Sequence, residues 1–384
     1  MARKQHYMFR EIVEQPEIIA SALDEERSSV KDIADVLGEK DIARMYIVGC
    51  GDMFFAATAA RHAFMELAKI YAEPVESMEL SRYLFSSIDE KCVVITLSVS
   101  GRTPRTIEAS KIAKRRGAYI IAITDNPGSP LTKTSDGVIY THTAPARELM
   151  KTKSKVPYVG YHHLVPQTKT YTTSLALLLS LATHLARCSK TSATMANLDR
   201  AVNSIKETIE LHDEKIRTLA EEYSNKNRYI FVGAGPNTGT ALYGSAKLME
   251  FGILGVAQQM EEYCHVQFFA TEPGDPVFII SPPGSASNRA LEILPEMRRA
   301  KCQTIALAKK DDEDLRNVPD QFIGMPDDVD EIFTPLYYCV PLQLFAYHLT
   351  VKKGLNPNKF RGGKNLNAYQ KATYQMIRKS RLRI

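Results

Sequence analysis

Four hydroxyl side chains gather in the stretch TLSVSGRTPRT, residues 96 to 106. They are Ser98, Ser100, Thr103 and Thr106, and they lie where the apolar run CVVITLS gives way to the helix-favouring run IEASKIAKRRG. The start of a helix offers free backbone N–H groups and the positive end of the helix dipole, so this point could bind an anion such as phosphate. No Walker lysine follows the glycine, which argues against a nucleoside triphosphate. Alternatively, these hydroxyls could do no more than cap the helix.

A second candidate pair is Lys247 and Glu250, three residues apart in ALYGSAKLME. This spacing places both side chains on one face of a helix. A carboxylate beside an ammonium group could move a proton between adjacent carbon atoms of a substrate while the lysine orients a hydroxyl. The alternative is an ordinary ion pair on the protein surface.

Histidines and cysteines give weaker signals. His265, in EEYCHVQFF, could act as an acid or base near neutral pH, although a lone histidine is more often structural. The doublet His162 and His163 has no acidic partner at a fixed spacing, so we assign it to a loop near the site and not to a metal. The six cysteines are far apart and form no C-x-x-C pair, which predicts neither zinc nor disulfides but small buried side chains. We expect no metal and no organic cofactor.

The elements that would position these residues alternate between short β-branched or aromatic runs and longer amphipathic stretches. This alternation predicts an α/β fold in which helices cover both faces of mostly parallel sheets. Residues 189–227 are interpreted as a connector, one long helix, and residues 9–40 as a similar segment before the first half. Strands are predicted at residues 44–49, 92–98, 118–124 and 137–142, and again at 228–233, 276–281, 303–308 and 320–325.

The two halves resemble each other. MYIVGCGDMFFAATAARHAFMELA from Met45 and RYIFVGAGPNTGTALYGSAKLMEFG from Arg228 share an apolar strand, a G-x-G turn and a helix rich in small residues. Neither copy has the third glycine of the dinucleotide fingerprint, so nicotinamide binding is disfavoured. The repeat predicts a duplicated fold of the nucleotide- or phosphosugar-binding type.

Length and composition set the broad class. A chain of 384 residues fits two domains, and a net charge of +5 is modest for this length. The basic runs VKKG, NKFRGGK and IRKSRLRI near the end are interpreted as a solvated face, so we expect no nucleic-acid partner. The apolar run SLALLLSLATHLA is shorter than the roughly 18 residues of a membrane span, so we expect no membrane partner. The N-terminal stretch lacks an apolar signal core, which predicts a cytoplasmic location.

Several of these motifs resemble the sugar isomerase (SIS) family, in particular the isomerase half of glucosamine-6-phosphate synthases. HYMFREIVEQPEII is similar to the segment that opens that half, GCGDM to its first-strand turn, and SVSGRTPRT to its phosphate loop S-Q-S-G-E-T-x-x-T. QTKTYTT is similar to S-T-K-A-F-T-T, and VPLQLFAYHLTVKKG to a segment with V-P-L-Q-L-L-A-Y-H. The resemblance covers nearly the whole chain.

For the fold, the resemblance implies two tandem SIS domains, each a three-layer α/β/α unit. We expect the first SIS domain at residues 41–188 and the second at 228–352. A helical segment, residues 1–40, would precede them, residues 189–227 would connect them, and a tail, residues 353–384, would close over the site.

For the site, the resemblance implies that Glu250 carries a proton between C1 and C2 of a sugar phosphate beside Lys247. His265 would open the sugar ring and would reach in from the neighbouring subunit of a homodimer. Lys371 is the best match to a sugar-contacting lysine in the tail. The phosphate and substrate site would comprise Gly51, Ser98, Ser100, Gly101, Arg102, Thr103, Gln167 and Thr168.

The chain also departs from the family pattern. Met53 and Gln167 stand where serines are usual, Val99 replaces the glutamine of the phosphate loop, and Arg102 replaces its glutamate. The guanidinium of Arg102 could restore phosphate affinity, because charge-assisted hydrogen bonds are the stronger ones, or it could point into solvent. An extra stretch, residues 146–163, precedes Gln167. We expect no glutaminase domain and therefore expect any ammonia to come from a separate source.

The function implied by the resemblance is an isomerase and deaminase that interconverts glucosamine 6-phosphate with fructose 6-phosphate and ammonia. One alternative is a deglycase for a 6-phosphorylated fructosamine such as fructoselysine 6-phosphate, in which the extra stretch would accommodate the amine. Another is a non-catalytic sugar-phosphate sensor. Such sensors often carry a DNA-binding domain, but residues 1–40 show no helix-turn-helix pattern.

Overall fold

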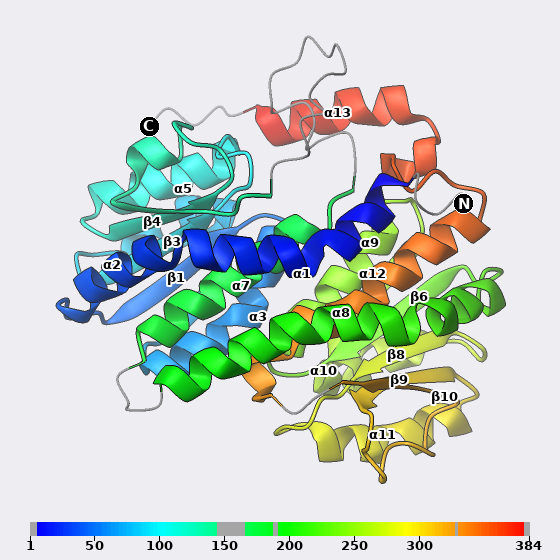
Figure 1. Cartoon of the computed structure of the whole chain (residues 1–384). Helices are drawn as coiled ribbons and strands as arrows, with labels where there is room; N and C mark the ends of the chain where they lie inside the picture. Colours follow the sequence, from blue (N-terminus) through cyan, green and yellow to red (C-terminus); the bar gives the residue numbers. More distant parts are fainter. Residues whose placement is uncertain (1–5, 144–165, 187–190, 327–328, 380–384) are drawn as a thin grey trace. The chain divides into compact units, whose positions relative to one another are not determined.

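The computed structural model describes residues 6–143, 166–186, 191–326 and 329–379 (Figure 1). The chain folds into two compact units, each with one five-stranded parallel sheet. The first unit comprises Glu17–Met195 and Asn365–Ile384, and the second comprises Met1–Pro16 and Ala196–Lys364. Each unit therefore contains a segment from the far end of the chain.

In the first unit the strand order is β2-β1-β3-β4-β5, and all neighbouring strands are parallel. Helix α7 packs on both α2 and α3, and α4 packs on α5. The strands are β1 Arg44–Gly49, β2 Ala72–Glu76, β3 Cys92–Leu97, β4 Tyr119–Thr124 and β5 Gly137–Tyr140. The helices are α2 Arg27–Gly38, α3 Asp52–Ala63 with a π-helical turn Phe64–Ala68, α4 Ser77–Glu79, α5 Pro104–Arg115, α7 Lys169–His184 and α13 Leu366–Arg378.

The second unit repeats this arrangement with the order β10-β9-β8-β6-β7, again all parallel. Helix α12 packs on α9, and α11 packs on β9. The strands are β6 Arg228–Gly233, β7 Leu254–Gln259, β8 Pro276–Ile280, β9 Gln303–Lys309 and β10 Gln321–Met325. The helices are α8 Thr191–Glu222, which begins in the first unit, α9 Asn237–Met249, α10 Met260–His265, α11 Ser287–Arg299 and α12 Pro335–Lys352.

The shared strand order has a functional meaning. In each sheet the chain leaves the first strand, β1 or β6, toward one side to form a single edge strand and then returns to build the other side. The order therefore reverses between β1 and β3, and between β6 and β8. In open parallel sheets of this order, ligands bind at the carboxyl ends of the strands at this switch point.

The eight predicted strands are all confirmed, to within one or two residues at their ends, but two strands were missed. Both missed strands, β2 with the sequence AEPVE and β7 with LGVAQQ, lie at an edge of their sheet. Edge strands tolerate proline and polar residues because one side of their backbone has no neighbouring strand. Gly255 of β7 has a further role, since a Cβ there would lie 2.5 Å from the backbone oxygen of Ser245 on α9.

The two predicted helical segments differ in outcome. Residues 189–227 contain one helix of 32 residues, α8, as predicted. Residues 9–40 are also helical, but the helix breaks at Glu26 into α1, Tyr7–Glu25, and α2. Glu26 is 5% exposed, and its Oε1 lies 2.7 Å from Nε2 of His142, which follows β5.

Helix α1 contributes to both units, since the boundary falls after Pro16. In its first part, the buried Gln15 exchanges side-chain hydrogen bonds of 2.8 and 2.9 Å with Gln343 of α12. The backbone N–H of Tyr7 donates to Oδ1 of Asn358 at 2.6 Å. The first part of α1 is therefore part of the core of the second unit.

The apolar run SLALLLSLATHLA lies in α7, a helix that is buried along nearly its whole length. No helix in the described ranges is long and apolar enough to cross a membrane.

Candidate active site

The loop between β3 and α5 has a backbone that requires glycine at one position. Gly101 has a φ of +58°, and a Cβ there would lie 2.1 Å from Oγ of Ser129. The N–H of Gly101 donates to the carbonyl of Ser98 at 2.8 Å, and its own carbonyl accepts from the N–H of Leu131 at 3.1 Å. The loop is thus fixed from both sides at the carboxyl end of β3.

The structure brings three of the predicted hydroxyls together in this loop. Oγ of Ser98 lies 2.9 Å from Oγ1 of Thr103, and Oγ of Ser100 accepts from the N–H of Arg102 at 3.3 Å. Thr103 occupies the N-cap of α5 but makes no side-chain capping hydrogen bond, so the capping interpretation is wrong for this residue. Thr106 is not part of the loop, because it is buried in α5 with Oγ1 3.0 Å from Oγ of Ser77.

Arginines flank the loop. Arg102 is exposed, and its contribution to phosphate binding stays a prediction. Arg105 was missed by sequence reasoning: Nη1 lies 2.5 Å from Oε2 of Glu108, and Nη2 donates to the carbonyl of Lys379 at 2.8 Å. Glu108 is 4% exposed and also pairs with Arg82 at 3.3 Å. The i,i+3 spacing of Arg105 and Glu108 is a signal that could have revealed the ion pair, but not the contact with the tail.

Gly51 lies at the same edge of the first sheet as this loop. It follows β1, has a φ of +58° and occupies the N-cap of α3. Because β1 and β3 are parallel neighbours, their carboxyl ends meet at the switch point. Met53 in the first turn of α3 is buried, so this chain has an apolar side chain inside the unit at the position where the resemblance implies a serine.

Gln167 and Thr168 lie at the start of α7 in the first unit. Gln167 is half-buried, and Thr168 is fully buried at the N-cap of the helix. Helix α7 packs on α3, the helix that follows Gly51. The first unit therefore holds all eight residues predicted for the phosphate and substrate site.

Cys50, beside Gly51, is not a nucleophile. Its Sγ donates to Oε1 of Glu76 at 3.1 Å, and burial raises the pKa of the thiol to about 11. A thiol with such a pKa is protonated at neutral pH and unreactive. The five described cysteines are free; Cys50 and Cys264 are only half-buried, contrary to the expectation that all are buried.

The second unit holds the predicted acid–base pair on α9. Nζ of Lys247 lies 2.9 Å from both Oε1 and Oε2 of Glu250. The lysine side chain is 0% exposed and the glutamate side chain 23%, so the interpretation as a surface ion pair is wrong. Nζ also lies 5.0 Å from the ring centre of Tyr243, which is itself buried. A buried ammonium requires such a partner, because removing an unpaired charge from water is costly.

Arg361 contacts the end of this helix and was not predicted. Its backbone N–H donates to the carbonyl of Glu250 at 2.6 Å, and a Cβ on Gly252 would lie 4.0 Å from its Nη1. Arg361 has a φ of +56° in a short 3₁₀ turn, Phe360–Gly363, and both Phe360 and Arg361 are half-buried. The basic run NKFRGGK is therefore not simply a solvated face.

His265 is the last residue of α10, and its side chain is 69% exposed. Nε2 lies 3.3 Å from Oε1 of Glu261. Arg289 holds that carboxylate at 2.9 Å and, with His265 as a smaller cause, lowers the pKa of Glu261. Val266 and Phe269, which follow His265, are 58% and 85% exposed. Within the described contacts of this unit, His265 pairs with Glu261, while Glu250 pairs with Lys247.

Other predicted residues lie apart or outside the description. Lys371 is an exposed residue of α13, which belongs to the first unit. His162, His163 and the extra stretch 146–163 lie outside the described residues, as does Cys188. In the described part of the chain, no group of three or more His, Cys, Asp or Glu side chains is arranged to hold a metal ion.

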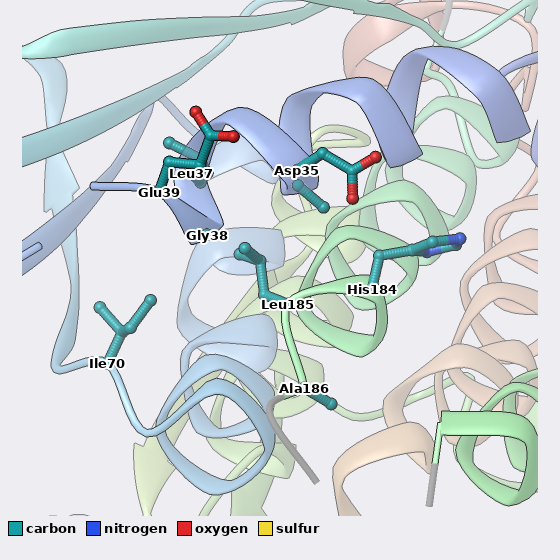
Figure 2. Close-up of a pocket in the computed structure, with 9 residues that line it drawn as sticks. Asp35, Leu37, Gly38, Glu39, Ile70, His184, Leu185 and Ala186 are labelled. Atoms are coloured by element: carbon teal, nitrogen blue, oxygen red, sulfur yellow. The ribbon is translucent and has the colours of Figure 1, made fainter. Parts of the chain in front are cut away.

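Two pockets of the first unit lie at the C-terminal ends of its helices, whereas the predicted site lies at the N-terminal ends. One, of about 830 Å³, is lined by the ends of α2 and α7, where Figure 2 shows the carboxylates of Asp35 and Glu39, and His184. His184 ends α7 and Thr168 precedes it, so about 24 Å of helix separate this pocket from the predicted site. The other, of about 310 Å³, is lined by Thr134 and by basic residues from the last turns of α5. Neither pocket contains a predicted site residue.

Comparison with known proteins explains the duplicated architecture. The family model of the SIS domain matches residues 40–184 and again residues 222–353. The chain belongs to the SIS domain family. Each match contains one of the two sheets with its switch point. The precise domain bounds given above stay a prediction.

Among curated relatives, this SIS chain is similar to glutamine–fructose-6-phosphate aminotransferase [isomerizing] of Thermococcus kodakarensis, with 34% identity over 361 residues. The enzyme of the same name from Pyrococcus horikoshii is 32% identical over 362 residues. Each match covers 92% of this chain but 56% of the relative. The SIS chain therefore spans little more than half the length of these relatives.

Solved structures show the same fold. The C-terminal domain of glucosamine-fructose-6-phosphate aminotransferase from Francisella tularensis matches with a TM-score of 0.79 and 22% identity, covering 92% of this chain and 98% of that one. Glucosamine-6-phosphate deaminase from Thermotoga maritima matches with a TM-score of 0.69 and 19% identity, covering 92% and 97%. These two likenesses extend over 92% of this chain and therefore include both units.

Proposed function

We propose that this SIS chain is a phosphosugar isomerase that interconverts glucosamine 6-phosphate and water with fructose 6-phosphate and ammonia. The observation that carries the proposal is the ion pair on α9, in which a fully buried Lys247 holds the carboxylate of Glu250 at 2.9 Å. A carboxylate fixed in this way is suited to general acid–base catalysis. The names of the relatives, an isomerizing aminotransferase and a deaminase, support this substrate class.

In the proposed reaction the sugar ring of glucosamine 6-phosphate first opens to the aldehyde. Glu250 then removes the proton from C2 and returns it to C1, while the aldehyde oxygen on C1 gains a proton and the amine nitrogen loses one, so that C1 becomes an alcohol and the amine on C2 becomes an imine. Water adds to the imine, ammonia leaves, and the C2 ketone of fructose 6-phosphate remains. Lys247 keeps the carboxylate oriented and can donate a hydrogen bond to a substrate hydroxyl. The sequence of steps requires no metal and no organic cofactor.

The phosphate end of the substrate is proposed to bind in the first unit, in the loop from Ser98 to Thr103. This loop combines the rigid turn at Gly101, the clustered hydroxyls and the start of α5. Together they supply neutral groups that can donate hydrogen bonds to an oxyanion. The exposed guanidinium of Arg102 could add a charge-assisted contact. Gly51, Gln167 and Thr168 are proposed to complete the site, with Lys371 of the tail against the sugar.

One assay tests the proposed function against its alternatives. The purified protein is incubated with glucosamine 6-phosphate, with fructose 6-phosphate plus ammonium, and with fructoselysine 6-phosphate, while ammonia, lysine and hexose phosphates are measured. Conversion of the first two supports the proposal. Release of lysine from the third substrate alone would make the chain a deglycase. No turnover of any substrate would replace the enzyme with a non-catalytic sugar-phosphate sensor.

We also propose that the enzyme is a homodimer in which His265 serves the active site of the other subunit. The exposure of His265, together with the adjoining exposed Val266 and Phe269, supports a contact surface at this position. Mixing Glu250→Gln and His265→Ala proteins tests this directly, because each mixed dimer would have one intact site. Random exchange should restore about a quarter of wild-type activity. If the mixture stays as inactive as its parents, the shared site is excluded.

A separate source of ammonia and a cytoplasmic location also remain proposals. Assays of the purified protein with free ammonium and with glutamine as alternative nitrogen donors would test the first. Turnover with glutamine alone would contradict it.

A further inference from the structure

The loop after β8 in the second unit corresponds to the phosphate loop after β3 in the first. The N–H of Ser98 donates to the carbonyl of Ile123 on the neighbouring strand at 3.1 Å, and the N–H of Ser281 donates to Leu307 in the same way at 2.9 Å. Each serine is followed three residues later by a glycine. Each loop then leads into a helix of 12 or 13 residues, α5 or α11. Both loops lie at a switch point.

In the second unit a carboxylate from elsewhere in the chain lies against this loop. The N–H of Ser285 donates to Oε2 of Glu331 at 3.1 Å. A Cβ on Gly284 would lie 2.1 Å from that same oxygen, and a Cβ on Gly235 would lie 3.5 Å from Oε1. Gly235 follows β6 and Gly284 follows β8, so the carboxylate contacts the two turns that define the switch point. A negatively charged group therefore occupies the place where a ligand is expected.

The corresponding N–H in the first unit has a different partner. Arg102 occupies the position equivalent to Ser285, and its N–H is bonded at 3.3 Å to the hydroxyl of Ser100. A Cβ on Gly101 would meet the hydroxyl of Ser129 and not a carboxylate. At the two positions where the second loop meets a carboxylate, the first loop thus meets neutral hydroxyls, which can rotate to donate to an incoming anion.

A buried hydroxyl in the second loop indicates that this loop once bound a ligand. Ser281 is 3% exposed, and its Oγ has no hydrogen-bond partner among the described residues. The equivalent Ser98 shares a hydrogen bond with Thr103, but Ala286 stands at the position of Thr103 in the second loop. Buried hydroxyls without partners are uncommon because each costs free energy. The residue is explained if the loop descends from an anion-binding one.

Glu331 is held in place by the core of its unit. It begins a short 3₁₀ turn, Glu331–Phe333, whose other two residues are buried. The hydroxyl of the buried Thr334 donates to the carbonyl of Glu331 at 2.7 Å and accepts from Nδ2 of the buried Asn237 at 2.8 Å. Asn237 is the first residue of α9, which follows β6. The backbone that presents the carboxylate is therefore fixed to the same switch point.

We propose that the loop after β8 is a second oxyanion site and that the chain fills it with its own Glu331 carboxylate. The site would accept a carboxylate or phosphate group once that side chain is removed. In the wild-type protein it is closed to sugar phosphates, so each chain binds a single phosphosugar, in the first unit. The filling of the second loop by Glu331 does not depend on the proposed reaction, whereas the binding of a single phosphosugar in the first unit rests on the proposed function.

Anion rescue of Glu331→Ala tests the inference. Thermal unfolding is measured in potassium chloride, acetate and phosphate at equal ionic strength for the wild type, for Glu331→Ala and for a matched control, Asp330→Ala. The control removes an exposed carboxylate one residue away, which accepts a hydrogen bond from Asn197 at 3.0 Å. In chloride we expect the midpoint of Glu331→Ala to fall by about 2–5 °C, because a hydrogen bond to a charged group is lost. Acetate and phosphate should restore most of this loss, with little gain in the control.

The comparison between variants separates this inference from the proposed function. Any phosphate effect through the first loop appears equally in all three proteins, so the extra gain of Glu331→Ala reports on the second loop alone. If the wild type does not respond to phosphate, the result argues against anion binding by the first loop. The difference between Glu331→Ala and Asp330→Ala would still test the second loop. Equal anion responses in Glu331→Ala and Asp330→Ala would overturn the inference.

Glu331→Gln decides the matter if Glu331→Ala does not fold. The amide keeps the shape and one acceptor oxygen but removes the charge, so we expect a lowered midpoint and no gain from acetate or phosphate, since the side chain still fills the site. A midpoint equal to that of the wild type would show that the loop does not require an anion, and the inference would be wrong.

Discussion

At the helical position where the second unit buries Lys247, the first unit has Ala63. Counting from the glycine that ends β1 or β6, Ala63 and Lys247 are equivalent, and Glu66 and Glu250 are the next equivalent pair. Ala63 and Lys247 are both fully buried, whereas Glu66 is exposed and Glu250 is mostly buried. The two units therefore share a scaffold but not its chemistry, since only the second pairs a buried ammonium with a carboxylate at this place.

In the loops after β3 and β8, it is the first unit that keeps the chemically useful side chains. The first keeps its hydroxyls around Gly101, while the second has lost the equivalent of Thr103 and has Glu331 against it. Under the proposed function, the roles are divided between the two copies: the second has the acid–base pair, which the first lacks, and the first has the open anion loop, which Glu331 closes in the second. Substitutions at equivalent positions can test this division.

The largest effect is expected from Glu250→Gln. Removal of the base should lower kcat about 10²- to 10⁴-fold while binding of the sugar phosphate persists. The matched control is Glu66→Gln at the equivalent, exposed position of the first unit, which should leave kcat unchanged. Steady-state kinetics and a binding titration measure both. A fully active Glu250→Gln protein would remove Glu250 from the mechanism.

Lys247→Met should reduce activity less, by about tenfold to a hundredfold, because the carboxylate remains but is no longer oriented. Methionine fills the buried space, yet the partly buried carboxylate of Glu250 loses its partner. We therefore expect the free energy of unfolding to fall by about 1–3 kcal/mol, less than for a fully buried pair. Urea unfolding of this variant is compared with Lys111→Met, an exposed lysine of α5. Unchanged kcat in Lys247→Met would contradict a role for the ammonium group.

Alanine substitutions at Gly101 and Gly284 should distinguish the roles of the two loops. Gly101→Ala would place a Cβ against Ser129 in a left-handed backbone, so we expect a loss of about 1–3 kcal/mol in stability and a higher KM for the sugar phosphate. Gly284 has no left-handed backbone, and the three atoms nearest to its Cβ would belong to the Glu331 carboxylate, the end of a flexible side chain. Gly284→Ala should therefore cost less stability and leave KM unchanged. Equal effects on KM would argue that both loops contact the substrate.

The smallest effect concerns His62, equivalent to Ala246 in the second unit. Burial, with a smaller contribution from Arg61, lowers the pKa of His62 to about 4. The unfolded chain therefore binds a proton below about pH 6.5 that the folded protein does not, so this residue's contribution to stability is full above that pH and is lost as the pH falls toward 4. Between pH 7 and 5 the wild type should lose about 1 kcal/mol more unfolding free energy than His62→Gln, after allowance for partial exposure. Identical pH profiles for the two proteins would rule this contribution out.

The sequence predicted the elements whose signals are local. The eight predicted strands, including the edge strands β5 and β10, have apolar runs, and α8 has a long helical periodicity. The edge strands β2 and β7 have the more polar sequences AEPVE and LGVAQQ and give no such signal. For the site, the hydroxyl loop and the Lys247–Glu250 spacing were visible in the sequence, but the burial of Lys247 depends on tertiary packing. The contacts of Arg361 with Glu250 and of Glu331 with Ser285 join residues far apart in the chain, and no local pattern reports them.

Helix α1 has a consequence for how the two units could ever be separated. Each unit includes a segment from the far end of the chain. Gln15 and its neighbours belong to the second unit, and the segment that begins at Asn365 belongs to the first. A cut in the connector near residue 190 would leave each fragment holding a piece that belongs to the other. The two SIS repeats are therefore not independent modules, and loss of either terminus would damage the unit encoded at the opposite end of the gene.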